Sequence, residues 1–338
     1  MDVRLSTEQQ ALRESVARVV DQLAPHAVGE IGNAERTSKL DAAVASSGWR
    51  ELRLGDDQGD PLATGVEAGI IAEEFGRGLA DVSFLGPTMA AELRRLAGAA
   101  QSESAETVAF TSDLSSIAIA ADGQLSSFVA IDASGCSRAL LLAARSDGNF
   151  LAEVDVASDE VGLDLTRPSS TLGSPASLEP SGRSISDDDL MRWTALGLSL
   201  TCADLVGIMQ GAVQLSTDYA SQRRQYGAPI GSFQAMQHML ADAFVMMEGS
   251  RSVTLHAAWA VDALHPRDAV GAASVAKAYC ARAARDVCET AIQVHGGIGN
   301  TWECLAHVYL RRALLSSDIF GGAGNSLDRV LQHYGIGA

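Results

Sequence analysis

The 338-residue sequence lacks an excess of basic side chains, with 25 Lys and Arg against 42 Asp and Glu and a net charge of −17. Nucleic-acid binding depends on clustered Lys and Arg, so this composition excludes nucleic acid as a partner. A small phosphate-containing ligand is not excluded, because one or two Arg side chains and a helix N-terminus are enough to hold it.

Signal and metal-binding patterns are also missing. The N-terminus carries charged residues and no apolar core of signal-peptide length, and no window of the sequence approaches a membrane span. The five Cys residues show neither paired nor metal-type spacing, which indicates buried free thiols in a reducing cytosol. These absences predict a cytoplasmic protein that contacts no membrane and holds no metal.

The hydrophobic pattern divides the chain into three parts. A helix is predicted over Ser6–Leu23, where Ser6 and Gln9 have capping-box spacing and apolar residues follow at helical intervals. Short β-branched runs follow later, and helical periodicity then returns to the end of the chain. The predicted domains are an N-terminal helical domain over 1–103, a reduced middle β domain over 104–187, and a C-terminal four-helix bundle over 188–338.

The middle part reads as a small antiparallel β domain. Asp122-Gly123 and Asp147-Gly148 are hairpin signals, whereas residues 169–189 have the Ser, Pro, Gly and Asp content of a loop. The predicted strands are Thr107–Ser112, Ser116–Ala121, Ser127–Asp132, Ala139–Ala144 and Asn149–Val154.

The most informative stretch joins two long helical segments through a Gly/Pro turn. It reads Arg223-Arg224-Gln225-Tyr226-Gly227-Ala228-Pro229-Ile230-Gly231-Ser232-Phe233-Gln234-Ala235-Met236-Gln237-His238. A second piece, some 60 residues further on, is Gln293-Val294-His295-Gly296-Gly297-Ile298-Gly299. The first resembles the R-x-x-F-G-x-P-I-x-x-F-Q-x-x-Q signature of acyl-CoA dehydrogenases, and the second matches that family in order and spacing. Glu73-Glu74-Phe75-Gly76-Arg77 is similar to a helix end of the same family.

The resemblance implies a mainly α fold with a central β domain and an FAD cofactor. In that family the two pieces face the flavin dinucleotide whose isoalloxazine ring lies in a neighbouring subunit. An Arg offers a cation to the pyrophosphate, and glycines let a ligand approach the backbone. The expected cofactor-binding residues are therefore Arg223, Gln225, Tyr226, Phe233, Gln234, Gln293, Gly296 and Gly297.

The family's catalytic glutamate has no counterpart at either of its usual positions. The stretch that corresponds to I-Y-E-G-T-S-E is Ile319-Phe320-Gly321-Gly322-Ala323-Gly324-Asn325, with Gly321 in place of Glu. The alternative position, on the helix that leads into the Arg223 corner, is Gly197, and Leu198 stands where many members carry a CoA-side Arg. Glycine cannot accept a proton, so we expect no catalytic residue in this chain.

The loops that cover a subunit's own flavin ring are also missing. Ala109-Phe110-Thr111-Ser112-Asp113 is the nearest approach to the family's T-E-P-x-x-G-S-D loop, and no K-x-(W/Y)-I-T strand follows. Asp318, Glu303, Glu73 and Glu74 are candidate substitute bases, but a solvated carboxylate is the simpler interpretation of each. The residues that serve the chain's own flavin are thus lost, whereas those that face a neighbour's flavin are kept.

Three hypotheses follow. The favoured one is a non-catalytic subunit of a hetero-oligomeric acyl-CoA dehydrogenase, similar to the α2β2 enzymes of actinobacteria that act on steroid side-chain CoA thioesters. Its partner would be a full-length subunit that carries the glutamate, shares the FAD and binds most of the acyl-CoA, with an electron-transfer flavoprotein or similar protein as acceptor. The alternatives are a self-sufficient homo-oligomeric flavoenzyme with a displaced base, and a non-enzymatic assembly module that has lost flavin.

Overall fold

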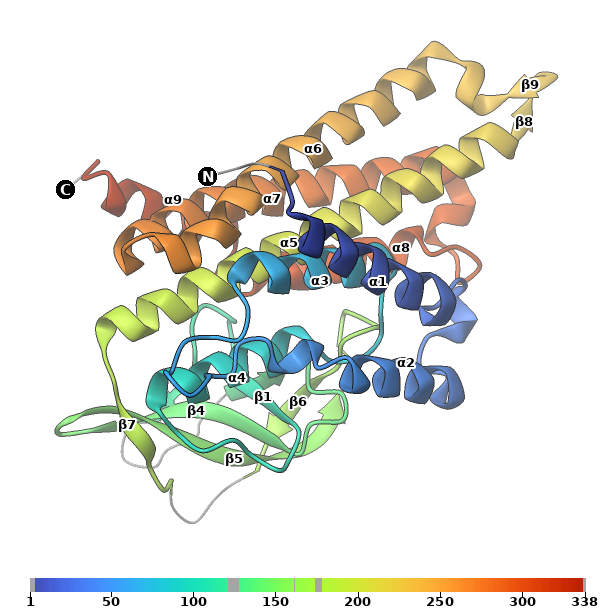
Figure 1. The fold of residues 1–338 in the computed structure, drawn as a ribbon. Coiled ribbons are helices and arrows are strands. Elements are labelled where there is room, and N and C mark those ends of the chain that lie inside the picture. The colour runs from blue at the N-terminus through green and yellow to red at the C-terminus, as the bar shows by residue number, and fades with distance from the viewer. Residues whose placement is uncertain (1–3, 121–127, 161, 174–177, 337–338) are drawn as a thin grey trace.

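The computed structural model describes residues 4–120, 128–160, 162–173 and 178–336. Figure 1 shows a sheet at one end of the molecule, the N-terminal helices beside it, and long helices that extend to the opposite end. The predicted class, mainly helical with a β region between two helical parts, is confirmed. The three long helices are α5 (Asp187–Gln222), α6 (Gln234–Ala263) and α7 (Pro266–His295).

The N-terminal helices begin and end where the sequence has the expected signals. The capping box is present at the start of α1, with the Ser6 side chain accepting from the Gln9 N–H and the Gln9 side chain accepting from the Ser6 N–H. Helix α3 ends at Arg77, as the Glu-Glu-Phe-Gly-Arg pattern predicted. These elements are α1 (Thr7–Leu23), η1 (Val28–Glu30), α2 (Ala34–Ser46), η2 (Trp49–Glu51), α3 (Gly65–Arg77) and α4 (Leu85–Ala97).

The sheet is mixed, so the prediction of a purely antiparallel domain is wrong. Its order is β2-β4-β1-β3-β6-β5-β7, and β4 pairs in parallel with both β1 and β2. Turn residues indicate where a strand ends but not which strand it pairs with, because strand pairing depends on contacts between residues distant in sequence. The strands are β1 (Glu106–Thr111), β2 (Ile119–Ala120), β3 (Phe128–Ile131), β4 (Arg138–Arg145), β5 (Gly148–Glu160), β6 (Ser169–Leu172) and β7 (Ser181–Ile185).

Two of these strands fall in the stretch that was predicted to be a loop. Both β6 and β7 pair antiparallel with β5, which gives their Ser-rich backbone the hydrogen bonds that its composition does not suggest. The hairpin signal at Asp147-Gly148 is confirmed, since Arg145 pairs with Gly148 across the β4–β5 turn. The other hairpin signal, Asp122-Gly123, lies outside the described residues.

Helix α5 corrects the statement that no segment approaches a membrane span. By length and composition it could cross a membrane, with a mean hydropathy of 1.5 over its most apolar 18-residue window. In the fold 89% of that window is buried, because α3, α6, α7 and α8 (Ala306–Asp318) pack around it. A helix enclosed on all sides is apolar on all sides, and α5 is the core helix of this protein. All five Cys residues are free and buried, as predicted.

Helices α3 and α5 cross at very short range. A Cβ on Gly207 would lie 1.8 Å from the Glu73 carbonyl oxygen, and one on Gly76 would lie 2.3 Å from the Asp204 carbonyl oxygen. Both positions therefore require glycine. The Gly of the Glu-Glu-Phe-Gly-Arg helix end is explained by this contact.

A buried ion cluster fastens the sheet to the helices. Asp204 on α5 accepts hydrogen bonds from Arg312 Nη2 at 2.6 Å and from Ser316 Oγ at 2.5 Å, both on α8. Arg167, in the β5–β6 connection, lies 3.1 Å from the same carboxylate and also pairs with Asp164. Burial alone would raise the pKa of Asp204, but the two guanidinium groups outweigh it and hold that pKa below its usual range.

Candidate functional site

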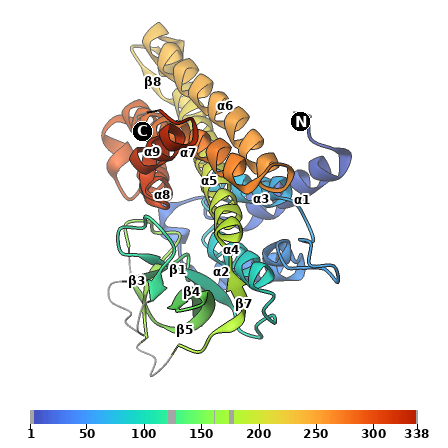
Figure 2. The same cartoon turned by 90° about the vertical axis from the view of Figure 1, so that its left-hand side faces the viewer.

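The corner between α5 and α6 projects beyond the rest of the molecule. After α5, strand β8 (Arg224–Gln225) pairs with β9 (Ala228–Pro229), and η3 (Ile230–Ser232) leads into α6. Figure 1 shows this hairpin at the upper right, at the end of the bundle away from the sheet, and Figure 2 shows the same end projecting upwards.

The hairpin tip holds a non-glycine residue in a left-handed conformation. Tyr226 has φ 50° and Gly227 has φ 80°, the pair of positive values that a type I′ turn requires. Glycine adopts this conformation freely, whereas Tyr does so at a cost. The turn leaves the Tyr226 side chain 95% exposed, with its ring available to a ligand or to another chain.

The five predicted residues of this corner all lie at the surface: Arg223, Gln225, Tyr226, Phe233 and Gln234. Within the described chain, no salt bridge is found for Arg223. Helix α6 begins after Phe233 without a side-chain cap. An unpaired guanidinium and an uncapped helix N-terminus each favour an anion.

The second predicted piece lies at the end of α7. Gln293 is exposed, and Gly296 has φ 64° where the chain turns from α7 into η4 (Gly296–Asn300). A Cβ placed on Gly296 or Gly297 would meet nothing within 4 Å. The turn therefore presents bare backbone to open space.

Packing brings the two pieces together. Val294 belongs to a small apolar cluster with Ala220 of α5 and Ile230 of η3, so the end of α7 lies against the α5–α6 corner. The rings of Tyr219 and His295 stack beside it, with centroids 4.4 Å apart. All eight predicted residues thus lie on the surface of one end of the bundle.

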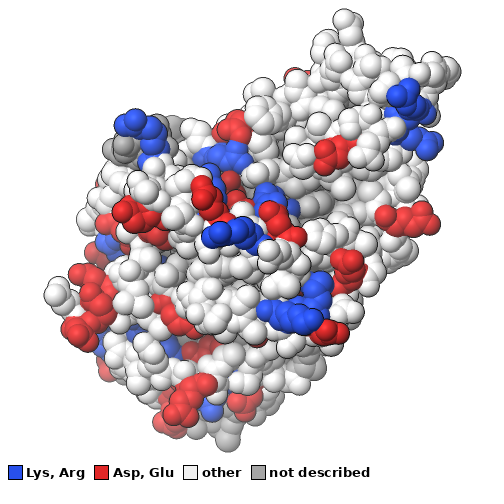
Figure 3. All heavy atoms as spheres, turned by 45° about the vertical axis from the view of Figure 1, so that its right-hand side comes forward, with Lys and Arg blue, Asp and Glu red and all other residues white. Residues whose placement is uncertain are grey.

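The charge of this end differs from that of the rest of the chain. Figure 3 shows a face on which the projecting end is mostly uncharged, with a group of basic side chains at its edge, whereas red and blue side chains alternate lower down. Arg223 and Arg224, both exposed, are the cations of the hairpin. A chain of net charge −17 therefore keeps a local site suited to a phosphate-bearing ligand.

Of the two positions usual for a base, Gly197 is closed by an aromatic ring that directly precedes the other, Gly321. A Cβ on Gly197 would lie 2.3 Å from the Phe320 ring, and Phe320 directly precedes Gly321. Phe320 is 1% exposed and packs on Phe110 and Trp193, with ring centroids 5.1 and 5.5 Å away. Sequence reasoning missed this aromatic cluster, although the Ile319-Phe320-Gly321 stretch contained its central member.

The β domain closes the same region from the other side. The Phe320 N–H donates to the Leu114 carbonyl at 2.7 Å, and Leu114 lies in the β1–β2 turn. That turn directly follows Ala109–Asp113, the nearest approach to the missing flavin-covering loop. The space between α5, this turn and the end of α8 is filled by side chains of the chain itself.

None of the four substitute carboxylates is placed as a base there. Glu73 is held by Arg251 at 3.0 Å, and Glu74 is held by Arg77 at 2.6 Å. Asp318 and Glu303 are exposed. The structure therefore assigns these four to ion pairs or to the solvated surface.

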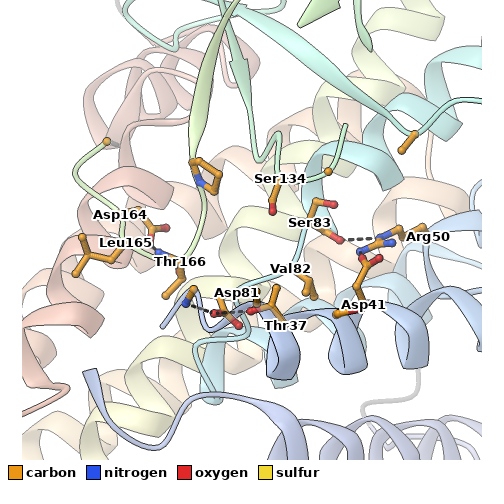
Figure 4. A pocket seen from close by; sticks show the side chains of 17 residues that line it. Thr37, Asp41, Arg50, Asp81, Val82, Ser83, Ser134, Asp164, Leu165 and Thr166 are labelled. Carbon is orange, nitrogen blue, oxygen red and sulfur yellow. Dashed lines mark hydrogen bonds and ion pairs between the residues drawn. The ribbon is translucent and has the colours of Figure 1, made fainter. Parts of the chain in front are cut away.

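A separate cavity of about 580 Å³ lies between α2, the α3–α4 turn and the loops of the sheet. Figure 4 shows its polar lining, in which Arg50 contacts Ser83 and Thr37 contacts Asp81. Arg50 donates to the Ser83 carbonyl at 2.7 Å and pairs with Asp41 at 2.6 Å. None of the eight predicted cofactor-binding residues lines this cavity. The guanidinium of Arg50, which does line it, is already paired with Asp41.

Comparisons with known proteins point to the same family that the motifs at Arg223 and Gln293 resemble. The family described as "Acyl-CoA dehydrogenase, C-terminal domain" matches residues 189–333. "Acyl-CoA dehydrogenase IpdE2" of Mycolicibacterium smegmatis is 28% identical over 96% of this chain and 98% of that protein. Residues 189–333 therefore match the C-terminal domain of acyl-CoA dehydrogenases, and nearly the whole chain is similar to one of these enzymes.

Solved structures show the same fold over almost the whole chain. The "Tcur3481-Tcur3483 steroid ACAD G363A variant" has a TM-score of 0.80 at 22% identity, covering 97% of this chain and 98% of that one. The ChsE4-ChsE5 complex from Mycobacterium tuberculosis has a TM-score of 0.80 at 21% identity, covering 99% of both chains. The predicted acyl-CoA dehydrogenase fold is confirmed.

Proposed function

We propose that this chain is the non-catalytic subunit of a hetero-oligomeric, FAD-dependent acyl-CoA dehydrogenase. It completes the FAD site of a full-length partner subunit, which supplies the catalytic glutamate and most of the acyl-CoA site. The reaction is the α,β-dehydrogenation of an acyl-CoA, with an electron-transfer flavoprotein or a similar protein as acceptor and with the cytoplasm as its location.

One contrast carries this proposal. The residues that in the family face a neighbour's flavin are exposed at the projecting end, and two of them, Gly296 and Gly297, open onto empty space. By contrast, the two positions where a base would act on the chain's own substrate are glycines, and Phe320 closes the space beside Gly197. A flavin held by this chain alone would have contacts on one side and no base on the other.

The outer face of the bundle supports a partner. Large apolar side chains are exposed on it, among them Phe244 at 51%, Val245 at 66% and Tyr279 at 44%. A groove of about 460 Å³ lies there between α6, α7 and α9 (Gly322–His333), and Val275 and Leu327 line it. Exposed large apolar side chains beside an apolar groove are typical of an interface between subunits.

The substrate class follows by analogy with the structural neighbours. One of them is described as a steroid acyl-CoA dehydrogenase formed by two proteins, and another is a complex of two chains. We infer that the acyl group here is a steroid side-chain CoA thioester. An α2β2 assembly with half the usual number of active sites would leave room for such a bulky group.

The experiment that tests the proposal is purification of the tagged chain alone and together with a full-length homologue encoded by an adjacent reading frame. We expect the chain alone to be poorly soluble or flavin-poor, because half a dinucleotide site provides half the contacts and the apolar face stays uncovered. With the partner we expect a yellow complex that oxidises acyl-CoA. The ratio of absorbance at the flavin and protein bands measures FAD occupancy.

Two results would overturn the proposal. One is a homo-oligomer of this chain with one FAD per protomer that oxidises acyl-CoA unaided, which would establish the self-sufficient enzyme. The other is a stable complex in which neither chain holds FAD, which would establish an assembly module.

A further inference from the structure

We propose that a cavity between α1, α3 and α6 binds a short aliphatic carboxylate, with its anionic head at Arg13 and its alkyl part among apolar side chains. This inference does not depend on the proposed function. It rests on a cavity with one charged and one apolar end, on an arginine with unused hydrogen-bonding capacity, and on a volume that admits only a few heavy atoms.

The cavity has a volume of about 120 Å³ and lies where these three helices meet. Helix α3 contacts both α1 and α6, and α6 passes above the two N-terminal helices in Figure 1. None of the eight predicted cofactor-binding residues lines the cavity, and neither do Gly197 and Gly321. It is therefore distinct from the proposed flavin site and from the usual positions of the base.

Helices α3 and α6 run in opposite directions beside the cavity. At the start of α3 the Gly65 N–H donates to the Asp262 carboxylate at 2.7 Å, just before the end of α6. Near the other end of α3, Glu73 pairs with Arg251 of α6 at 3.0 Å. The two helices therefore place different groups at the two ends of the cavity.

The end near the start of α3 is apolar. Val66, Ile70 and Ala258 form a small buried cluster, and Leu5 and Leu255 pack against it. All five line the cavity. This end can hold alkyl groups, and burying them there is favourable.

The opposite end is charged, and Arg13 is the residue there with unused donors. Its Nη2 lies 3.6 Å from Glu73 Oε2, which is an ion pair but too long for a hydrogen bond. Its Nε is buried and has no hydrogen-bond partner among the described residues. Arg251, by contrast, donates to Glu73, Glu248 and Gln210.

The charges of the lining determine the charge of the ligand. Two guanidinium groups, of Arg13 and Arg251, face one carboxylate, that of Glu73. Glu248 pairs with Arg251 but does not line the cavity, so Arg13 is the cation that lacks a carboxylate of its own. One carboxylate balances this lining, whereas an amine would add to the positive excess and a phosphate dianion would leave a negative one.

The volume determines the length of the ligand. A water-sized group occupies about 30 Å³ of liquid, so the cavity holds about four heavy atoms. The side chains of Arg13 and Arg251 are 30% and 25% exposed, so the carboxylate can lie partly at the mouth while the alkyl chain fills the interior. Butyrate is the probe that fits this description.

The first experiment is isothermal calorimetry of the full chain, and of its purified complex, with butyrate and with butyramide. The amide has the same size and shape but no charge. We expect butyrate to bind at one site per copy of this chain and butyramide to bind at least about tenfold more weakly, because the charge-assisted bonds to Arg13 are lost. No binding of butyrate, or equal binding of the two compounds, would overturn the proposal.

The second experiment assigns the binding to this cavity. Arg13→Met removes the charge and keeps an apolar stem, and Arg18→Met is the matched control, since Arg18 lies on the same helix, is exposed and does not line the cavity. We expect Arg13→Met to weaken butyrate binding at least about tenfold and Arg18→Met to leave it unchanged. Equal affinities in the two variants would refute the assignment.

A third variant and a comparison of the two samples complete the test. If Arg13→Met fails to fold, Leu255→Phe enlarges a half-buried side chain at the apolar end and should weaken butyrate binding by filling its space. Unchanged affinity in that variant would also refute the site. Butyrate that binds the chain alone but not the complex would mean that the partner subunit covers the cavity, and the proposal of a small-molecule site would be wrong.

Discussion

Replacing Gly321 with Glu restores a carboxylate at a usual position of the base in sequence, but we expect it to restore no activity. The base must come within about 3 Å of the substrate α-carbon, with a flavin ring on the opposite side. Here the adjacent space is occupied by Phe320, whose ring leaves no room even for a Cβ on Gly197. The new carboxylate would have no substrate within reach.

The stability cost of this substitution can be worked out from its backbone. Gly321 has φ 82°, a left-handed conformation that costs an ordinary residue about 1–2 kcal/mol. Its Cβ would also lie 2.0 Å from Asn325 Nδ2 and 2.9 Å from Asn325 Cβ, so the exposed Asn325 side chain must turn away and its Cβ must shift slightly. We therefore expect Gly321→Glu to fold and to lose about 1–2 kcal/mol of unfolding free energy, mainly through backbone strain.

Gly324→Glu is the matched control. It adds the same side chain three residues later, where a Cβ meets nothing within 4 Å and the backbone is not left-handed. Because Gly is a poor helix residue and Glu is favourable near a helix N-terminus, we expect this control to be neutral or more stable by up to about 1 kcal/mol. Urea unfolding of the two variants compares their free energies.

The activity assay uses a complex whose partner subunit carries Gln in place of its catalytic Glu. Acyl-CoA oxidation is measured with an artificial electron acceptor for the Gly321→Glu and Gly324→Glu variants. Both should be inactive. Turnover that returns with Gly321→Glu alone would mean that this chain binds its own flavin and substrate, and that the Phe320 cluster opens in the assembly.

Two further predictions follow. Arg223→Ala should weaken FAD binding in the complex by about 1.5–3 kcal/mol, roughly tenfold to a hundredfold in Kd, and added FAD should restore much of the turnover. The exposed Arg285→Ala is its control, and unrecovered activity at excess FAD would show that Arg223 acts elsewhere. The fully buried Lys277 has its pKa lowered by burial to about 8. The unfolded chain therefore binds this proton more tightly, and unfolding free energy should rise between pH 8 and 10.5 by roughly 3 kcal/mol. Urea unfolding across that range should show a flatter profile in Lys277→Met, and an identical profile would refute the assignment.

The sequence by itself determined the features that depend on near neighbours in the chain. The Ser6 capping box, the end of α3 at Arg77 and the hairpin at Asp147 are local patterns whose hydrogen bonds join residues a few positions apart. The Arg223 corner and the Gln293 turn both resemble motifs of one family. This resemblance predicted the fold in outline, because each motif occurs at a defined place in the fold of that family.

Tertiary structure decided what depends on residues distant in sequence. Strand pairing made the sheet mixed, and it turned the Ser-rich stretch after Arg167 into two strands. The sequence showed a glycine at position 197 but not that the Phe320 ring lies against it, because that contact joins α5 to the far end of α8. Local patterns specify where helices and strands begin and end. Which side chains pack between those elements depends on residues from several distant parts of the chain.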